Sequence, residues 1–114
     1  MKDDAGRLQD ILEAVCRIEK YAARGRDAFV RDELVQTWTI HNLQIIGEAA
    51  RKVSEAVKAR HPEVPWRQII AMRNILVHDY FTVDPEEVWA AVEGDLPDLG
   101  IKIKCILREL GSTP

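Results

Sequence analysis

Four side chains with hydrogen-bonding groups lie together in residues 73–80, whose sequence is RNILVHDY. They are Arg73, Asn74, His78 and Tyr80, and the positions between Asn74 and His78 are apolar. Arginine offers a planar fork that matches phosphate oxygens, and histidine exchanges a proton near neutral pH. Asparagine can orient either group, and tyrosine adds a hydroxyl and a flat ring for a base. This combination predicts a site for a nucleic-acid phosphodiester.

The chemistry that these residues suit is cleavage of RNA without a metal ion, because RNA carries its own nucleophile. In this hypothesis His78 removes the proton of a ribose 2′-hydroxyl, whose oxygen attacks the adjacent phosphorus. Arg73 stabilises the negative charge that develops on the phosphoryl oxygens, and one product carries a 2′,3′-cyclic phosphate. In an unbroken helix Arg73 and His78 point to different sides. They can converge only if the helix loosens near 78–80 or if a second subunit completes the site.

Each of these residues also has a purely structural explanation. Arg73 could lie at the core edge and pair with Glu48 or Asp79, since a guanidinium on an apolar face requires a partner. His78 could be a residue of a helix C-terminus, where the helix dipole favours its charged form. Tyr80 could hold the following loop in place. Glu48 is a carboxylate on an otherwise apolar stripe, which makes it a candidate supporting residue for Arg73 in either case.

The elements that must position the motif are helices, because apolar residues recur at helical spacing and capping and proline signals separate the segments. We expect an all-α fold, a four- or five-helix up-and-down bundle that dimerises, with residues 1–114 as one domain. The expected helices are a first that ends at Gly25, a second from about Asp27 to Ala59, a third from Trp66 through Val77, a fourth capped by Asp84, and a last at roughly 96–110.

The predicted second helix has features that bear on the site. Its apolar band is wide, which favours contact both with a bundle core and with a dimer partner. At about 1.5 Å per residue it would be on the order of 50 Å long. Gly47 within it permits a bend or a close crossing with another helix. We expect Trp38 and Trp66 in the core, and Cys16 and Cys105 as small core residues rather than a disulfide or a metal pair.

Composition and charge narrow the class of protein. The 114 residues are 46% hydrophobic, carry a net charge of −3 and contain no apolar run that could span a bilayer. A cytoplasmic protein without metal or other cofactor is expected, with His41 and His61 structural or at the surface. Residues 51–73 hold six basic and two acidic side chains, whereas residues 79–98 hold seven acidic and no basic ones. This asymmetry predicts a positive strip leading to the motif and an acidic surface for a protein partner.

The segment RNILVHDYF resembles the R-x4–6-H-x-Y signature of HEPN-domain proteins. Three blocks, LQIIGEAARKVSE, HPEVPWRQIIAMRNILVHDYF and VWAAVEGDLPDL, are similar to the HepT-like branch, and the resemblance covers roughly residues 8–110. It implies a dimerising all-α bundle and a metal-independent endoribonuclease that acts as a toxin. It also implies an MNT-type minimal nucleotidyltransferase as the antitoxin. The motif arginine would be Arg73, its polar neighbour Asn74, the motif histidine His78 and the motif tyrosine Tyr80.

In related systems the antitoxin transfers AMP from ATP to the motif tyrosine, so the resemblance makes Tyr80 the expected modification site. An adenylyl group there would add bulk and negative charge where substrate phosphate should lie. One alternative is a non-catalytic helical partner of a nucleotidyltransferase, in which Arg73 and His78 contact nucleotide or protein. Another is a structural homodimer whose motif is a polar network. The acidic segment 79–98 fits the non-catalytic partner equally well, because it disfavours RNA.

Overall fold

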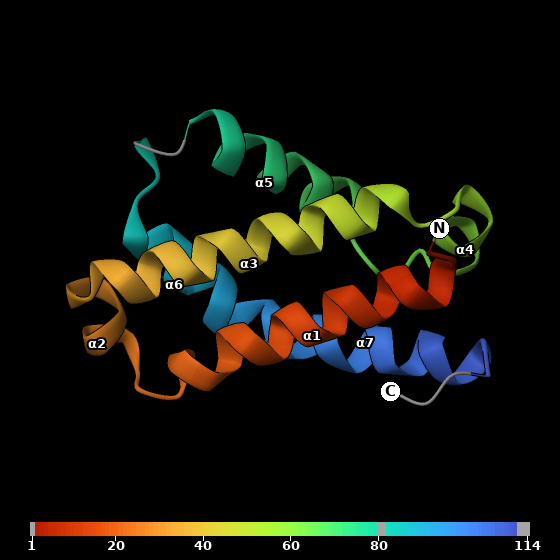
Figure 1. The fold of residues 1–114 in the computed structure, drawn as a ribbon, viewed down its shortest axis with the longest axis horizontal. Coiled ribbons are helices and arrows are strands. Elements are labelled where there is room, and N and C mark those ends of the chain that lie inside the picture. The colour runs from red at the N-terminus through yellow and green to blue at the C-terminus, as the bar shows by residue number, and fades with distance from the viewer. Residues whose placement is uncertain (1, 80–81, 112–114) are drawn as a thin grey trace.

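A computed structural model describes residues 2–79 and 82–111, in which seven α-helices and no strand are found. The helices are α1 (Asp4–Ala22), α2 (Arg26–Arg31), α3 (Glu33–Lys52), α4 (Glu55–Arg60), α5 (Trp66–His78), α6 (Pro85–Gly94) and α7 (Leu96–Glu109). The long helices α1, α3, α5 and α7 run in alternating directions, and the molecule measures 41 × 27 × 25 Å (Figure 1). The predicted all-α class is confirmed.

Short polar side chains explain where several helices begin. The carboxylate of Asp3 accepts the backbone N–H of Gly6 at the start of α1, and that of Asp84 accepts the N–H of Glu86 at the start of α6. Such N-caps satisfy donors that the first helical turn leaves unpaired, each contributing about 1 kcal/mol. The predicted cap at Asp84, followed by Pro85 at the first helical position, is confirmed.

The prediction of one continuous helix from about Asp27 to Ala59 is wrong. The chain leaves the helical conformation at Asp32, whose side chain accepts the N–H groups of Leu34 and Val35, and again at Val53, before Ser54 caps α4. Asp and Ser side chains offer the backbone alternative hydrogen bonds, and here they end the helix although the apolar spacing continues. The expected 50 Å helix is therefore three helices, and the described residues contain more helices than the four or five predicted.

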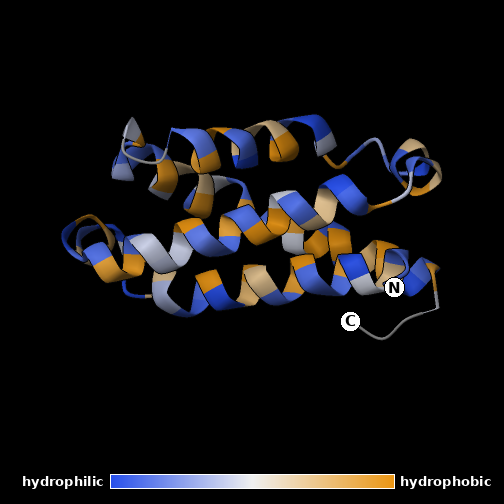
Figure 2. Cartoon of the chain, turned by 45° about the horizontal axis from the view of Figure 1, so that its top comes forward, coloured by the Kyte–Doolittle hydropathy of each residue, from blue (hydrophilic) through white to orange (hydrophobic). Residues whose placement is uncertain are grey.

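The core lies where α1 packs against both α3 and α7 (Figure 1). Apolar and polar residues alternate along these helices at helical spacing (Figure 2). Each fully buried aliphatic side chain contributes about 1.5–3 kcal/mol of transfer free energy. The core positions that are at most 1% exposed include Leu8, Ile11, Val15, Ile18, Leu43, Ile46, Ile103, Ile106 and Leu107.

Some residues expected in the core lie elsewhere. Trp66 is buried as predicted, but Trp38 is 39% exposed: its ring meets the edge of Tyr21, and its indole N–H donates to the Arg17 carbonyl oxygen at 3.3 Å. This arrangement keeps the polar end of an amphipathic ring at the surface. Cys16 and Cys105 are both exposed, because their positions on α1 and α7 fall outside the buried stripes of those helices.

Helix α5, which carries the motif, packs chiefly on α3 (Figure 1). The side chain of Gln44 on α3 donates to the Leu76 carbonyl oxygen at 3.1 Å and ties the last turn of α5 to its neighbour. Helix α6 packs against α7 and α2. Its contact with α2 includes the rings of Phe29 and Trp89, whose centroids are 5.4 Å apart. Among the described helices, none combines the length and the apolarity needed to cross a membrane.

Candidate functional site

Helices α3 and α5 pack closely against each other at Gly47, which lies against Arg73. A Cβ atom on Gly47 would lie 2.1 Å from the Arg73 Cβ, 2.7 Å from the Arg73 Cγ and 3.2 Å from the Ile69 carbonyl oxygen. Only a residue without a side chain fits there, so the predicted close crossing at Gly47 is confirmed. The crossing brings the Arg73 guanidinium next to the residue that follows Gly47 on α3.

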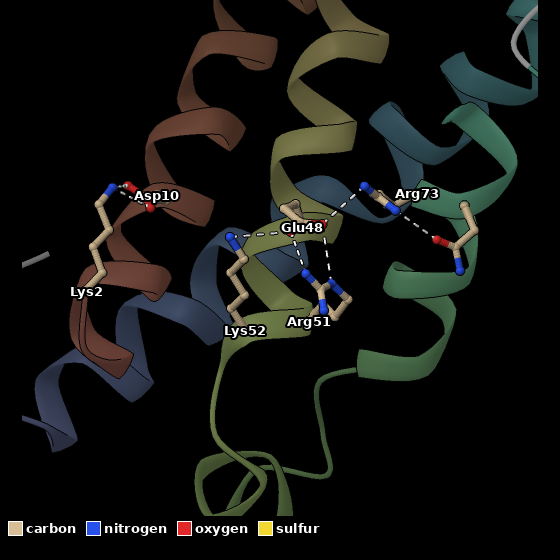
Figure 3. A network of polar contacts seen from close by, with 7 residues as sticks. Lys2, Asp10, Glu48, Arg51, Lys52 and Arg73 are labelled. Carbon is tan, nitrogen blue, oxygen red and sulfur yellow. Dashed lines mark hydrogen bonds and ion pairs between the residues drawn. The ribbon is translucent and has the colours of Figure 1, made fainter. Parts of the chain in front are cut away.

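That residue is Glu48, and it gathers three cationic side chains (Figure 3). Its carboxylate lies 3.3 Å from Arg73 Nη2, 2.7 Å from Arg51 Nη2 and 3.4 Å from Lys52 Nζ. We call these four residues the Glu48 cluster. Its net charge is +2, because one carboxylate faces three cations. The contact between Arg73 and Glu48 that the sequence suggested is present, and it fits the catalytic hypothesis and the structural alternative equally.

The Glu48 carboxyl is held firmly in its ionised form. The hydrogen bond from Arg51 is the largest cause, and the hydrogen bond from Lys52 and the positive charge of Arg73 add to it, whereas burial acts in the opposite direction. Together these effects lower the pKa of Glu48 from 4.5 to about 2. At neutral pH the Glu48 carboxylate is therefore always charged, and its ion pair with the guanidinium helps to position Arg73.

Arg73 is held on a second side by its own neighbour in the sequence. Its Nη1 donates to the side-chain oxygen of Asn74 at 3.1 Å. A guanidinium carries five N–H donors, and the contacts to Glu48 and Asn74 leave the remainder for a ligand. The Arg73 side chain is 28% exposed, so the group is partly desolvated and still reachable. Such an arrangement can bind a phosphate oxygen in a fixed orientation.

His78 is the last residue of α5 and is exposed. After it, the Asp79 N–H donates to the Ile75 carbonyl oxygen at 2.8 Å and the chain leaves the helix, as the expected loosening near 78–80 requires. Arg73 and His78 lie five residues apart on α5, which places them about 140° apart around the helix, and within residues 2–79 and 82–111 no hydrogen bond or ion pair joins them. The motif residue Tyr80 lies outside the described residues.

The sequence analysis missed Arg51 and Lys52 as neighbours of Arg73. Their signal was their spacing, three and four residues after Glu48, which places cationic side chains beside a carboxylate on a helix surface. Of the six basic residues in the predicted positive strip along residues 51–73, Arg51, Lys52 and Arg73 meet at Glu48. In the described part of the chain no group of histidine, cysteine and acidic residues could hold a metal ion.

His61 is an internal structural residue rather than part of this site. It is 8% exposed, and its Nδ1 and Nε2 lie 3.0 Å from carboxylate oxygens of Glu63 and Glu109. The Trp66 indole donates to the His61 carbonyl oxygen at 3.0 Å. These contacts connect the segment before α5 with the end of α7. The other histidine outside the motif, His41, is exposed on α3.

Comparison with known proteins adds to this geometry. Residues 11–106 match the family described as ribonuclease HepT-like. The chain belongs to this family. A protein named "Probable ribonuclease HepT" from Thermococcus cleftensis is 40% identical to it over 93 residues, which cover 81% of this chain and 84% of that protein. The matched region of this chain contains the motif helix α5 and the Glu48 cluster.

Further HepT-like relatives match over nearly their whole length. A protein named as a candidate RNase from Caldanaerobacter subterraneus subsp. tengcongensis is 32% identical over 110 residues, 96% of this chain and 98% of its own. Another, from Methanocaldococcus jannaschii, is 29% identical over 106 residues, 92% of this chain and 97% of its own. No solved structure matches the chain significantly. The relatives therefore support a ribonuclease of the HEPN type.

Proposed function

We propose that this protein is a metal-independent endoribonuclease whose reacting groups are Arg73 and His78. The main support is the position of the Arg73 guanidinium, which rests on Gly47, is oriented by Glu48 and Asn74, and belongs to a cluster with a net positive charge. A fixed cation with free donors is what stabilises charge developing on a phosphoryl group. The HepT-like family and the names of its members agree with this activity.

The proposed reaction is an internal transfer within RNA. His78 takes the proton of a ribose 2′-hydroxyl, the 2′-oxygen forms a bond to the adjacent phosphorus, and the bond from phosphorus to the 5′-oxygen breaks. The leaving 5′-oxygen takes up a proton from water, His78 returns its proton to the solvent, and Arg73 stabilises the phosphoryl oxygens while five oxygens surround phosphorus. The products end in a 2′,3′-cyclic phosphate and a 5′-hydroxyl.

A second copy of the chain would complete the site. Arg73 and His78 point to different sides of α5, and two apolar side chains of the same helix are unusually exposed: Ile75 at 55% and Val77 at 41%. Pairing the α5 helices of two copies would bury these side chains and bring one Arg73 near the partner copy's histidine. We therefore include a homodimer in the proposal, and sedimentation of the purified protein tests it.

The biological role that we propose is that of the toxin in a toxin–antitoxin pair. The antitoxin would be an MNT-type nucleotidyltransferase that transfers AMP to Tyr80. This step forms a bond between the tyrosine oxygen and the α-phosphorus of ATP and releases pyrophosphate. Co-expression with such an enzyme should add the mass of one AMP to the wild type and none to Tyr80→Phe. An unchanged wild-type mass together with restored growth would show that inhibition occurs by binding.

The deciding experiment is cleavage of total cellular RNA by the purified protein in EDTA. Wild type should cut, His78→Ala should not, and His41→Ala, which removes an exposed histidine of α3, should cut like the wild type. New ends should carry the cyclic phosphate. Absence of cleavage by a wild type whose intact mass shows no AMP would overturn the catalytic proposal.

A second candidate function is a non-catalytic partner of a nucleotidyltransferase. It is favoured by residues 79–98, whose seven acidic and no basic side chains repel RNA next to the motif. In that case His78→Ala would leave the growth phenotype unchanged and would weaken binding of the nucleotidyltransferase or of its nucleotide, which His78 contacts. The ribonuclease proposal expects the opposite for growth, because toxicity then depends on His78.

A further inference from the structure

A cleft lies behind the motif helix, on the side of α5 that faces α6 and α7. Its volume is about 410 Å³, and its apolar lining includes Leu43, Ile46, Ile69, Met72, Leu96 and Leu99. The cleft lies between α5, which packs chiefly on α3, and residues 94–99, where α6 is followed by α7. The volume is within the range of about 300–1,000 Å³ that is typical of ligand pockets, and it has room for a bulky apolar side chain.

The polar groups around this cleft are mainly acidic. Glu63, Asp95 and Asp98 line it together with a single cation, Lys102. The Lys102 ammonium is already engaged, because it lies 2.8 Å from both the Asp98 carboxylate and the Glu63 carbonyl oxygen. The hydrogen bonds that Glu63 accepts from its own N–H and from His61 lower the pKa of the Glu63 carboxyl, which keeps it charged. The rim therefore has a net charge of −2.

Asp95 is the carboxylate on this rim that is free to meet a ligand. It occupies the N-cap position of α7, but its side chain makes no capping hydrogen bond. Within the described part of the chain it has no ion pair or side-chain hydrogen bond either. It is also exposed. An apolar cleft beside an unpaired carboxylate selects a ligand that combines an apolar body with a positive charge.

Further carboxylates lie on α6, the helix whose last turn lines the cleft. Glu87 and Glu93 are exposed there, Glu86 is paired with Arg26 of α2, and no basic residue occurs in residues 79–98 themselves. A nucleic acid is disfavoured by this charge. The extent of the surface exceeds what a small cation needs, whereas a peptide segment with several basic residues would match it.

We propose that this cleft binds a short basic amphipathic segment of a partner protein. One apolar side chain of the segment fills the cleft as an anchor, and lysine or arginine residues next to it pair with Asp95 and the acidic surface of α6. The proposal does not depend on the ribonuclease activity. The lining residues Ile46 and Met72 directly adjoin Gly47 and Arg73 in the sequence, so an occupied cleft would also brace the crossing that positions the motif arginine.

Nuclear magnetic resonance on the full chain labelled with nitrogen-15 tests this binding. The probe is a blocked peptide, Lys-Lys-Leu-Trp-Lys-Lys, and two matched peptides replace either both apolar residues by alanine or every lysine by glutamate. Only the first should cause saturable shifts, and these should be confined to amides around the cleft such as those of Ile69, Leu96 and Lys102. No shifts at about 1 mM peptide, or equal binding of either matched peptide, would overturn the proposal.

Variants localise the effect. A Cβ on Gly94, which lines the cleft, meets nothing within 4 Å, so Gly94→Phe should place a ring at the mouth and weaken binding at least tenfold. Asp95→Asn should weaken peptide binding about threefold in low salt. Glu19→Gln, which removes an exposed carboxylate on α1, should leave peptide binding unchanged. Asparagine caps helices as well as aspartate, so this variant decides the test if Gly94→Phe does not fold. Equal binding by Asp95→Asn, or the same shifts with a single-stranded RNA, would contradict the inference.

Discussion

Arg73 lies directly over Gly47, so that a methyl group on Gly47 would come within 2.1 Å of the Arg73 Cβ. This contact leaves no room for a side chain between α3 and α5 at Gly47, because the Arg73 Cβ is next to the backbone and cannot rotate away. It also places the motif guanidinium within 3.3 Å of Glu48. The position of the candidate catalytic arginine therefore depends on a residue with no side chain.

Gly47→Ala should destabilise the protein by about 3 kcal/mol, the upper end of the range for overpacked helix contacts. The control is Gly94→Ala, where a Cβ meets open space and the better helix former should add up to about 1 kcal/mol. Urea unfolding followed by circular dichroism measures both. Equal stability of Gly47→Ala and wild type would mean that α3 and α5 do not cross so closely.

Arg73→Lys should leave the fold intact and lower RNA cleavage by about 100-fold. Lysine keeps the charge, but it lacks the planar fork that can hold Glu48, Asn74 and a phosphate oxygen at once. Arg108→Lys, at an exposed position on α7, should cleave normally. Turnover of a fluorescent oligonucleotide gives the comparison. Full activity of Arg73→Lys would remove the guanidinium from the mechanism.

Glu48→Gln should lower the free energy of unfolding by about 1 kcal/mol at neutral pH, since the pairs of this carboxylate are partly exposed and screened. The folded pKa of Glu48 is about 2, below its ordinary value of 4.5. The stabilisation is therefore complete above pH 4.5 and is lost as the pH falls toward 2. The gap between wild type and variant should close over that window, and Glu19→Gln is the control for replacing an exposed carboxylate on a helix.

His61→Ala should lower the melting temperature by roughly 4–8 °C, because it removes a buried side chain that meets carboxylates on both nitrogens. His41→Ala should leave it unchanged. The pKa of Glu63 is lowered by its own N–H and by His61. The stability that the ionised Glu63 carboxylate contributes is therefore present above pH 4.5 and is lost as the pH falls below it. The effect of His61→Ala on melting should therefore be larger at pH 7 than at pH 3.

Cys16 and Cys105 should both react with a thiol reagent in the folded protein, because both are exposed. Without denaturant, the wild type should react with two equivalents of the reagent per chain. Cys16→Ala should react with one equivalent. Labelling that appears only on unfolding would place the cysteines in the core, as their sequence context had suggested.

The sequence predicted the helical class and several helix ends correctly because these depend on local interactions. Asp84 and Pro85 begin α6, the prolines around Val64 separate α4 from α5, and the last helix, α7, falls within a residue of its expected bounds. The breaks at Asp32 and Ser54 were missed because apolar spacing continues through them. Spacing reports which face could be buried, and it does not report where a side chain captures the backbone instead.

The sequence by itself determined the motif residues Arg73, Asn74 and His78, the all-α class and the resemblance to the HepT-like family, since residue type and spacing carry that information directly. Only the tertiary structure decided that Arg73 rests on Gly47 and shares Glu48 with Arg51 and Lys52, and that a cleft opens behind α5. The physical reason is that these features arise where two helices far apart in the chain cross. Their distance is set by the packing of both surfaces at once.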